Sequence, residues 1–346
     1  MSTIVNENNK QTVWDFWQVL DDANPGNVES TVRSAMAENV SWHGPDPIND
    51  LQGVEAFISH FWQPLQQSFP DLKRQSHLFV SGQSNGRIDG DISLDGQMWV
   101  SGTGYFNGTF EKSYLTIPAT GKEVHIRWGE FCRMEEGKIV EVFLLLDLVD
   151  LMQQAGYQVL PPSRGKDGLY PAPKANDGVL LEKQEIKQSA YSLDHIRRFI
   201  FEGLNSYDQS ELKSMGMADF FDSEVQWYGP SGIGACLSLK EFEDFHQQPW
   251  LIAYPDRQVQ DLDALIAEGS YSGGSAWAGV KATHTGPYMQ VPATGHSINF
   301  NGLDWWKREG EMYIENWVFV DMIHLFRQLG IDLFERLAEQ KRVGGK

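Results

Sequence analysis

The chain has 346 residues, of which 41% are hydrophobic and 12% aromatic, so its length suits two or three domains with packed cores. Its formal net charge of −19 would repel nucleic acid phosphates, and no apolar run reaches the roughly 18 residues of a membrane helix, so neither nucleic acid nor a membrane is an expected partner. The polar N-terminus has no apolar signal-peptide core, and the two cysteines suggest no disulfide framework, so a reducing cytoplasm is the expected location.

An amphipathic helix is predicted near the start of the chain, because apolar residues at 13, 16, 17 and 20 share one helical face. A second helix is predicted at 28–37, a short strand at 40–42, and a stronger helical pattern at 53–67, which Pro70 ends. Four strands then follow, with a hairpin turn at 135–138 and a short helix at 148–155 that stops at Gly156. The predicted strands are 77–81, 99–110, 122–134 and 139–146.

The chain contains an internal duplication. The sequence Pro-Ala-Thr-Gly occurs at 118–121 and again at 292–295, so that equivalent positions differ in number by 174 (292 − 118). Earlier echoes, such as Trp42 with Trp227, differ by 185 (227 − 42), so the first copy carries extra length between Asp71 and its Pro-Ala-Thr-Gly. Each copy has the size of a small domain, and we therefore predict two domains of the same fold.

A segment rich in Pro and Gly separates the two copies. We expect domain 1 at 1–160, a linker at 161–178 and domain 2 at 179–346. A helix is predicted at 180–189, and the second copy then repeats the order of the first, with helices at 192–206, 209–219 and 239–250 before its strands. Helices followed by an antiparallel sheet indicate the α+β class, in which three helices laid on a curved sheet enclose a cone-shaped cavity.

The last strand of each copy carries carboxylates among apolar residues. Side chains two positions apart share one face of a strand, so each copy places two carboxylates at the ends of an apolar stripe. Such surroundings can raise a carboxyl pKa towards neutrality and make the group a general acid or base. The alternative is that Asp147 and Asp321 cap the short helices that follow them. The two stripes are Glu141, Phe143, Leu145, Asp147 and Glu315, Trp317, Phe319, Asp321.

Histidines are the second set of candidates, and they are not duplicated. His284 lies in Thr-His-Thr-Gly before the second Pro-Ala-Thr-Gly, and the first copy has no His at the equivalent place. His43 of the first copy likewise corresponds to Tyr228 of the second. His125 and Arg127 have Asn at the equivalent places of the second copy. A single His is commonly a hydrogen-bonded structural residue, so a structural role for His284 stays open.

Motifs for cofactors and metals are missing from the sequence. No two His residues have helical i, i+4 spacing, no Cys pairs with a nearby His, and no phosphate loop or nucleophile elbow occurs. A cofactor-free acid/base enzyme without a metal, or a ligand-binding shell, therefore remains.

The combination of Thr283–Gly286, Pro292–Gly295, Glu315–Asp321 and Gln328-Leu329-Gly330 resembles the SnoaL-like polyketide cyclases of the nuclear-transport-factor-2-like superfamily. The first copy shares the Pro-Ala-Thr-Gly, Asp147 and Gln-Ala-Gly but lacks the Thr-His-Thr-Gly segment. The resemblance implies two tandem cone-shaped α+β barrels. It also implies ring closure or isomerisation of a hydrophobic carbonyl compound without a cofactor.

The resemblance also implies roles for individual residues. Asp321 would be the acid/base group, with Asp147 as its counterpart, and His284 would polarise a carbonyl or enolate oxygen. The alternative is a non-catalytic binding module whose first copy is degenerate and supports the second across a pseudo-twofold interface, with a further homo-oligomer left open. The residues expected to line the two pockets are Trp227, Tyr228, Glu315, Trp317 and Phe319 in the second copy and Trp42, His43 and Phe143 in the first.

Overall fold

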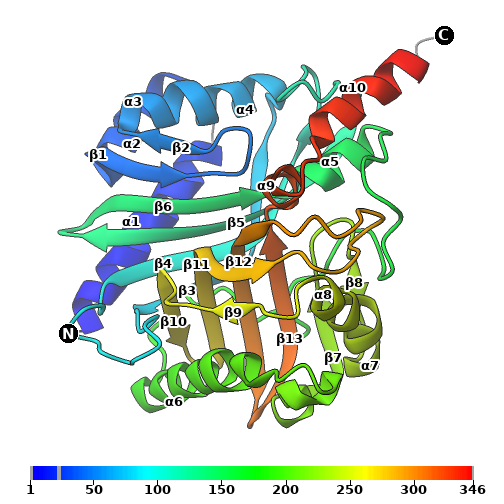
Figure 1. The fold of residues 1–346 in the computed structure, drawn as a ribbon. Coiled ribbons are helices and arrows are strands. Elements are labelled where there is room, and N and C mark those ends of the chain that lie inside the picture. Colours follow the sequence, from blue (N-terminus) through cyan, green and yellow to red (C-terminus); the bar gives the residue numbers. More distant parts are fainter. Residues whose placement is uncertain (1–2, 22–24, 345–346) are drawn as a thin grey trace.

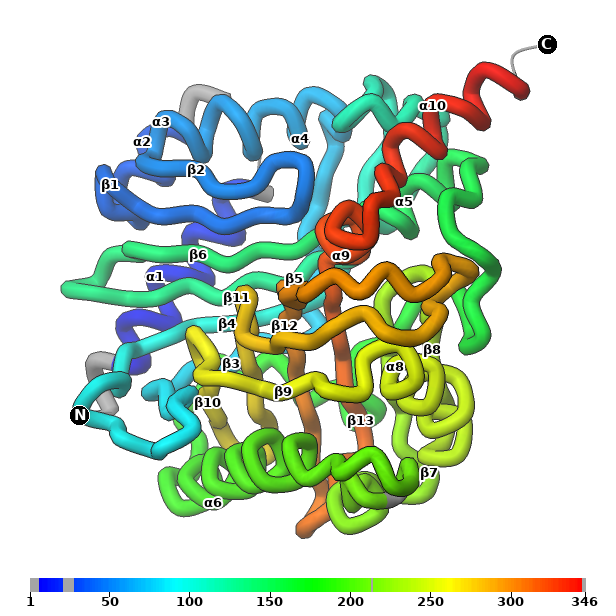
Figure 2. The backbone as a smooth tube through the Cα atoms, viewed as in Figure 1, coloured from blue at the N-terminus to red at the C-terminus, as the bar shows by residue number. Residues whose placement is uncertain are grey.

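The computed structural model describes residues 3–21 and 25–344. They form two α+β domains, each a sheet with helices on one side, and the sheets of the two domains face each other across the middle of the molecule (Figures 1 and 2). The expected fold class is confirmed, with one refinement: both sheets are open, with edge strands β2 and β3 in the first.

Domain 1 has a six-stranded sheet of order β2-β1-β6-β5-β4-β3. The sheet is antiparallel, as expected, except at one pair: β1 runs parallel to the last strand, β6, beside which it lies. The elements are α1 (Thr3–Asp21), α2 (Pro25–Ala35), β1 (Met36–His43), β2 (Asp50–Gln52), α3 (Val54–Ala56), the π-helical η1 (Phe57–Trp62), α4 (Gln63–Ser68), β3 (Lys73–Gln83), β4 (Met98–Thr109), β5 (Glu123–Glu135), β6 (Lys138–Leu146) and α5 (Leu148–Gln154).

Domain 2 repeats this arrangement, and its β13 also pairs with β7 in parallel. Two helix predictions need correction: helix α6 begins at Ile186 rather than at 180, and 209–219 forms two short 3₁₀ turns, the second after a left-handed Gly216. The elements are α6 (Ile186–Arg197), η2 (Arg198–Gly203), η3 (Leu204–Ser206), η4 (Leu212–Met215), η5 (Met217–Asp219), β7 (Phe221–Tyr228), β8 (Ala235–Cys236), α7 (Leu239–Phe242), η6 (Glu243–Gln247), α8 (Gln248–Ala253), β9 (Gln258–Val259), β10 (Ala264–Glu268), β11 (Tyr271–Thr283), β12 (Ser297–Glu309), β13 (Met312–Val320), α9 (Met322–Gln328) and α10 (Leu333–Gly344).

Local sequence explains the repeated features. The apolar face of α1 is buried, as its spacing predicted, and Gly156 and Gly330 end α5 and α9 with φ of 92° and 82°. Pro70-Asp71, which follows the third predicted helix of the first copy, recurs as Pro255-Asp256 at the offset of 185, and this repeat also has a structural reason. Asp71 accepts hydrogen bonds from the backbone and hydroxyl of Thr109, and Asp256 accepts the same pair from Thr283.

The extra length of the first copy lies in the loop 84–97 between β3 and β4, whereas only 269–270 separate β10 from β11. This loop contacts domain 2. Asn85 N donates to Leu265 O at 2.9 Å, and Arg197 Nη1 donates to Asn85 O at 2.7 Å. The insertion is therefore part of the contact between the two domains.

The inner faces of the two sheets meet in a shared aromatic and aliphatic cluster, in which Phe131 stacks on Trp305 at a ring distance of 5.1 Å. The linker is bound to both domains, since Gly165 N donates to Ile233 O and Phe79 N donates to Gly178 O, both at 2.9 Å. Helix α10 extends from domain 2 past the end of domain 1, as Figure 1 shows. No helix within the described part of the chain is both long and apolar enough to cross a membrane.

Candidate functional site

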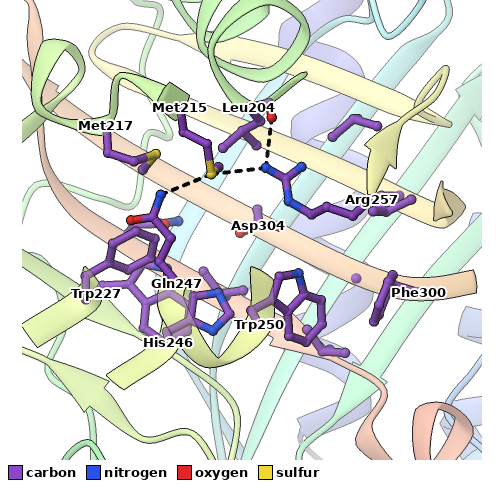
Figure 3. A pocket seen from close by; sticks show the side chains of 18 of the residues that line it. Leu204, Met215, Met217, Trp227, His246, Gln247, Trp250, Arg257, Phe300 and Asp304 are labelled. Atoms are coloured by element: carbon purple, nitrogen blue, oxygen red, sulfur yellow. Dashed lines mark hydrogen bonds between the residues drawn. The ribbon is translucent and has the colours of Figure 1, made fainter. Parts of the chain in front are cut away.

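The interior of domain 2 holds a cavity of about 170 Å³ between its helices and its curved sheet (Figure 3). Aromatic, aliphatic and thioether side chains form most of its wall. A few polar side chains project into it from three different elements. The main apolar lining residues are Phe199, Leu204, Met215, Met217, Phe221, Trp227, Trp250, Phe300 and Trp306.

Alternation along β12 and β13 decides which side chains reach this cavity. The lining residues from β12 are Phe300, Gly302, Asp304 and Trp306. Those from β13 are Asn316, Val318 and Val320. The intervening residues of both strands point towards domain 1. The even-numbered face of β13, and not the face that carries Glu315 and Trp317, is therefore the cavity face.

Asp304 is the carboxylic acid of this cavity. It lies on β12, lines the cavity and is partly buried. Burial raises the pKa of the Asp304 carboxyl to about 7, although a side-chain hydrogen bond with Asn316 opposes the rise. At neutral pH the group is therefore present in both its acid and its base form, as proton transfer requires.

His246 enters the cavity from the π-helical turn η6. Its ring stacks on Trp227 at a centroid distance of 4.4 Å and an interplanar angle of 18°. Burial, together with the charge of Arg257, lowers the pKa of His246 to about 3. The imidazole is therefore neutral at physiological pH and offers one N–H donor and one acceptor.

Arg257 precedes β9 and is 8% exposed. Its Nη2 donates to Leu204 O at 2.8 Å and contacts Met215 Sδ at 3.5 Å, and Figure 3 shows both contacts. Burial lowers the pKa of Arg257 to about 10, which leaves the side chain charged at neutral pH. Gln247 Nε2 donates to the same Met215 Sδ at 3.0 Å.

The structure places Asp321 and Asp147 outside this cavity, at the starts of α9 and α5. Asp321 Oδ1 accepts from His324 N at 3.0 Å, and its Oδ2 accepts from Asp46 N of domain 1 at 2.8 Å. Asp147 accepts likewise from Asp150 N and from Ser231 N of domain 2. Both carboxylates thus cap a helix, the alternative that their sequence position left open, and each also binds the other domain.

His284 is also absent from the cavity lining. Its Nδ1 accepts from Thr294 N at 3.2 Å, and its ring lies 5.4 Å from that of Tyr254. The backbone pattern around it matches that of Phe110, because both residues pair with the strand that follows the Pro-Ala-Thr-Gly turn. In domain 1, Phe110 stacks on Phe69, so His284 occupies a core position. The structure therefore does not bring His284 and Asp321 together on the cavity.

The expected pocket-lining residues divide between cavity and interface. Trp227 lines the cavity, whereas Phe319 borders it only from the interdomain side, where its ring packs on Trp305 and Arg127. Glu315 accepts a hydrogen bond from the backbone N–H of Lys174 in the linker. The rings of Tyr228 and Trp317 lie in the interdomain cluster, as does Phe143, which stacks on His43 at 4.7 Å. Trp42 belongs to the core of domain 1, beside Phe61 at 4.7 Å.

The corresponding interior of domain 1 is occupied by large side chains. Glu130, the equivalent of Asp304, accepts from Trp17 Nε1 at 3.1 Å and pairs with Arg74 Nη1 at 3.0 Å. The Arg74 guanidinium lies 4.5 Å from the ring of Trp17 and 4.4 Å from that of Trp128. Domain 2 has Val259 and Gly302 at the places of Arg74 and Trp128, and this loss of volume opens its cavity.

The polar cavity residues could have been found by applying the two repeat offsets to every position. At those offsets, domain 1 has Phe61, Trp62 and Leu72 where domain 2 has His246, Gln247 and Arg257. A change from apolar to polar at three interior positions was the available signal. Within the described ranges, no group of three His, Cys, Asp or Glu side chains is arranged to hold a metal ion.

The model of the SnoaL-like polyketide cyclase family matches residues 14–155 and 195–329, one match in each domain. Among solved structures, IdmH from Streptomyces antibioticus, a candidate polyketide cyclase, is 20% identical over 43% of this chain and 98% of its own, with a TM-score of 0.34. A candidate SnoaL-like polyketide cyclase from Jannaschia sp. CCS1 is 19% identical over 42% of this chain and 90% of its own, with a TM-score of 0.32.

AclR from Streptomyces galilaeus, a candidate hydroxylase, is 18% identical over 41% of this chain and 97% of its own, with a TM-score of 0.33. No curated protein matches the chain at a significant level.

Proposed function

Because the chain belongs to the SnoaL-like polyketide cyclase family, we propose that domain 2 is a cofactor-free acid/base enzyme that acts on a small hydrophobic carbonyl compound. Membership of this family supports a cyclase-like function in general but does not identify a particular reaction or substrate. The observation that carries the finer proposal is Asp304, a carboxyl with a pKa raised by burial to about 7, on the wall of an apolar cavity.

The proposed reaction starts with proton abstraction next to a carbonyl group. The Asp304 carboxylate takes the proton from carbon, and the electron pair of the broken C–H bond moves to the carbonyl oxygen to give an enolate. The N–H of neutral His246 is the donor available to this oxygen. Return of the proton from Asp304 to another carbon completes an isomerisation.

An aldol cyclisation needs only one further step in the same cavity. The enolate carbon attacks a second carbonyl carbon of the same molecule, and the alkoxide that forms takes the proton held by Asp304. No electron acceptor or cofactor is consumed. The aromatic wall around Trp227, Trp250 and Trp306 would hold the substrate in a folded conformation and keep water away from the enolate.

For domain 1 we propose a supporting role. Glu130 replaces Asp304 there, but its two oxygens bind Trp17 and Arg74, and bulky rings surround the pair. Both carboxylate oxygens are thus occupied, and the surrounding rings leave no room beside them for a substrate. This arrangement supports a degenerate, non-catalytic domain 1, and it does not extend that alternative to domain 2.

The test is the exchange of carbon-bound protons of acetophenone in deuterated water, followed by NMR. Asp304→Asn should lower the exchange rate by about 10²–10⁴-fold, the usual contribution of a general base. Glu130→Gln at the equivalent place of domain 1 is the matched control and should retain the rate in the folded protein. Unchanged exchange in Asp304→Asn would reject the assignment, and an inert but ligand-binding parent protein would favour a binding module.

A further inference from the structure

We propose that the cavity of domain 2 binds a hydrophobic carboxylate of about one ring, with the carboxylate held by Arg257. This deepens the proposed function by naming the class of ligand, and it rests on that function only in placing the ligand at the same cavity.

The first support is the incomplete set of partners around Arg257. Its guanidinium makes one hydrogen bond to a carbonyl and one contact to a thioether, both through Nη2. No carboxylate among the described residues lies within ion-pair distance of it, and Nε and Nη1 donate to none of those residues. Arg308, which is equally buried, uses Nε, Nη1 and Nη2 for three hydrogen bonds.

The second support is the comparison with Arg74, the guanidinium in the interior of domain 1. Arg74 in domain 1 is paired with Glu130 and is covered by the rings of Trp17 and Trp128. Its charge is compensated, as buried charges in proteins generally are. Arg257 is also buried, but its side-chain partners among the described residues are a carbonyl and a thioether, and neither carries a negative charge. An anionic ligand would supply the missing partner.

A planar carboxylate suits the Nη1/Nη2 edge of Arg257, where Nη1 donates to no described residue and the 3.5 Å contact from Nη2 to Met215 Sδ can give way to a carboxylate oxygen. The guanidinium presents its N–H groups as a rigid fork that matches the two oxygens of a carboxylate. The rest of the ligand would lie against the ring surfaces of Trp250 and Phe300, which Figure 3 shows on the same side of the cavity as Arg257. The cavity thus combines one charged anchor with an apolar body, as binding sites for small molecules commonly do.

The volume limits the ligand to about one ring. The cavity measures about 170 Å³, close to the roughly 150 Å³ of an engineered apolar cavity that accepts benzene, and below the roughly 300 Å³ at which drug-sized pockets begin. A larger depression of about 650 Å³ lies outside it, walled by Pro161 and Pro162 of the linker and sharing Ile233 and His246 with the cavity. A ligand would enter the cavity from this depression and pass His246 on the way.

The experiment compares benzoate with benzamide, which have the same shape and differ in charge. Both are titrated into the full chain while the fluorescence of the cavity tryptophans is recorded. Benzoate should bind at least about tenfold more tightly, since hydrogen bonds between charged groups are about twice as strong as neutral ones. The three-ring anthracene-2-carboxylate should bind more weakly than benzoate because the cavity cannot hold it.

Variants connect this preference to Arg257. Arg257→Gln should remove it, Arg257→Lys should keep part of it while retaining the positive charge, and Arg198→Gln on the outer surface of the same domain is the control that should keep all of it. Circular dichroism shows whether each variant is folded. If Arg257→Gln does not fold, the benzoate preference of Arg257→Lys decides whether Arg257 holds the carboxylate.

Equal binding of benzoate and benzamide, a preference that survives in Arg257→Gln, or no binding of either compound at millimolar concentration would overturn the proposal. Tighter binding of the three-ring acid would overturn the size limit. Asp304→Asn separates the two proposals: it should keep the benzoate preference. If it also keeps proton exchange, only the acid/base assignment fails.

Discussion

Phe131 and Trp305 occupy equivalent positions of the two copies, at the same offset as the repeated Pro-Ala-Thr-Gly, and their rings stack on each other at 5.1 Å. A residue that meets its own equivalent lies on the axis of an isologous contact. The two aspartate contacts obey the same relation. Asp321 accepts from Asp46 N, and Asp147 accepts from Ser231 N, which is the equivalent of Asp46 at the offset of Trp42 and Trp227. The duplicated Asp thus serves the contact between the domains.

Replacing Trp305 tests the importance of this contact for stability. Trp305→Ala should lower the free energy of unfolding by about 3–5 kcal/mol, because it leaves a cavity between the sheets. It also removes the bond from Trp305 Nε1 to Ser101 Oγ. Trp305→Phe, which makes the pair symmetric, should cost clearly less. Urea denaturation measures both, and an alanine variant as stable as the parent would show that the stacked pair contributes nothing.

Removing the carboxylate of Asp321 should reduce stability and leave chemistry unchanged. Asp321→Ala takes away a helix cap and leaves Asp46 N unpaired, which together should cost about 2–4 kcal/mol. Asp147→Ala should behave alike, since it has the same two contacts. Denaturation and acetophenone exchange are measured on the same samples. A stable Asp321→Ala protein that has lost exchange would return the acid/base role to Asp321.

The stability of the protein should depend on pH through Asp304. Burial raises the pKa of its carboxyl to about 7 in the folded protein, above the roughly 3.9 of an unfolded chain. The folded state therefore holds the proton more tightly, and this contribution to stability is complete below about pH 4 and is lost as the pH rises through about 7.

Asp304→Asn should remove part of this fall in the free energy of unfolding between about pH 4 and pH 7, so that the variant becomes more stable relative to the parent as the pH rises across this range. Asp244→Asn, a change in an exposed ion pair with Lys240, is the control and should follow the parent. Parallel curves for Asp304→Asn and the parent would show that the carboxyl titrates normally in the folded protein.

Filling the cavity with the residue of the other copy should abolish ligand binding. Val280 lines the cavity, and the equivalent residue of domain 1 is the buried Phe106. Val280→Phe should weaken benzoate binding at least about tenfold because it removes the volume that a one-ring ligand needs. Val343→Phe on the exposed side of α10 is the control. Undiminished affinity in a folded Val280→Phe protein would place the ligand elsewhere.

The sequence alone determined the duplication, the order of the elements and the α+β class. Two offsets that stay constant over long stretches require two equivalent folds, and the apolar spacing of α1 and of the strands is a local property of the chain. The position of Asp321 before an apolar helical segment was also sufficient to suggest a cap, and the structure shows that cap.

Only the tertiary structure decided which face of the last strand meets the cavity. Alternation along β13 separates Glu315, Trp317 and Phe319 from Asn316, Val318 and Val320, but it does not tell which set faces the helices. Both faces are buried, one by the helices of the same domain and one by the sheet of the other, so hydrophobicity gives no distinction. The cavity likewise depends on the volumes of Gly302 and Val259, which act only where distant strands converge.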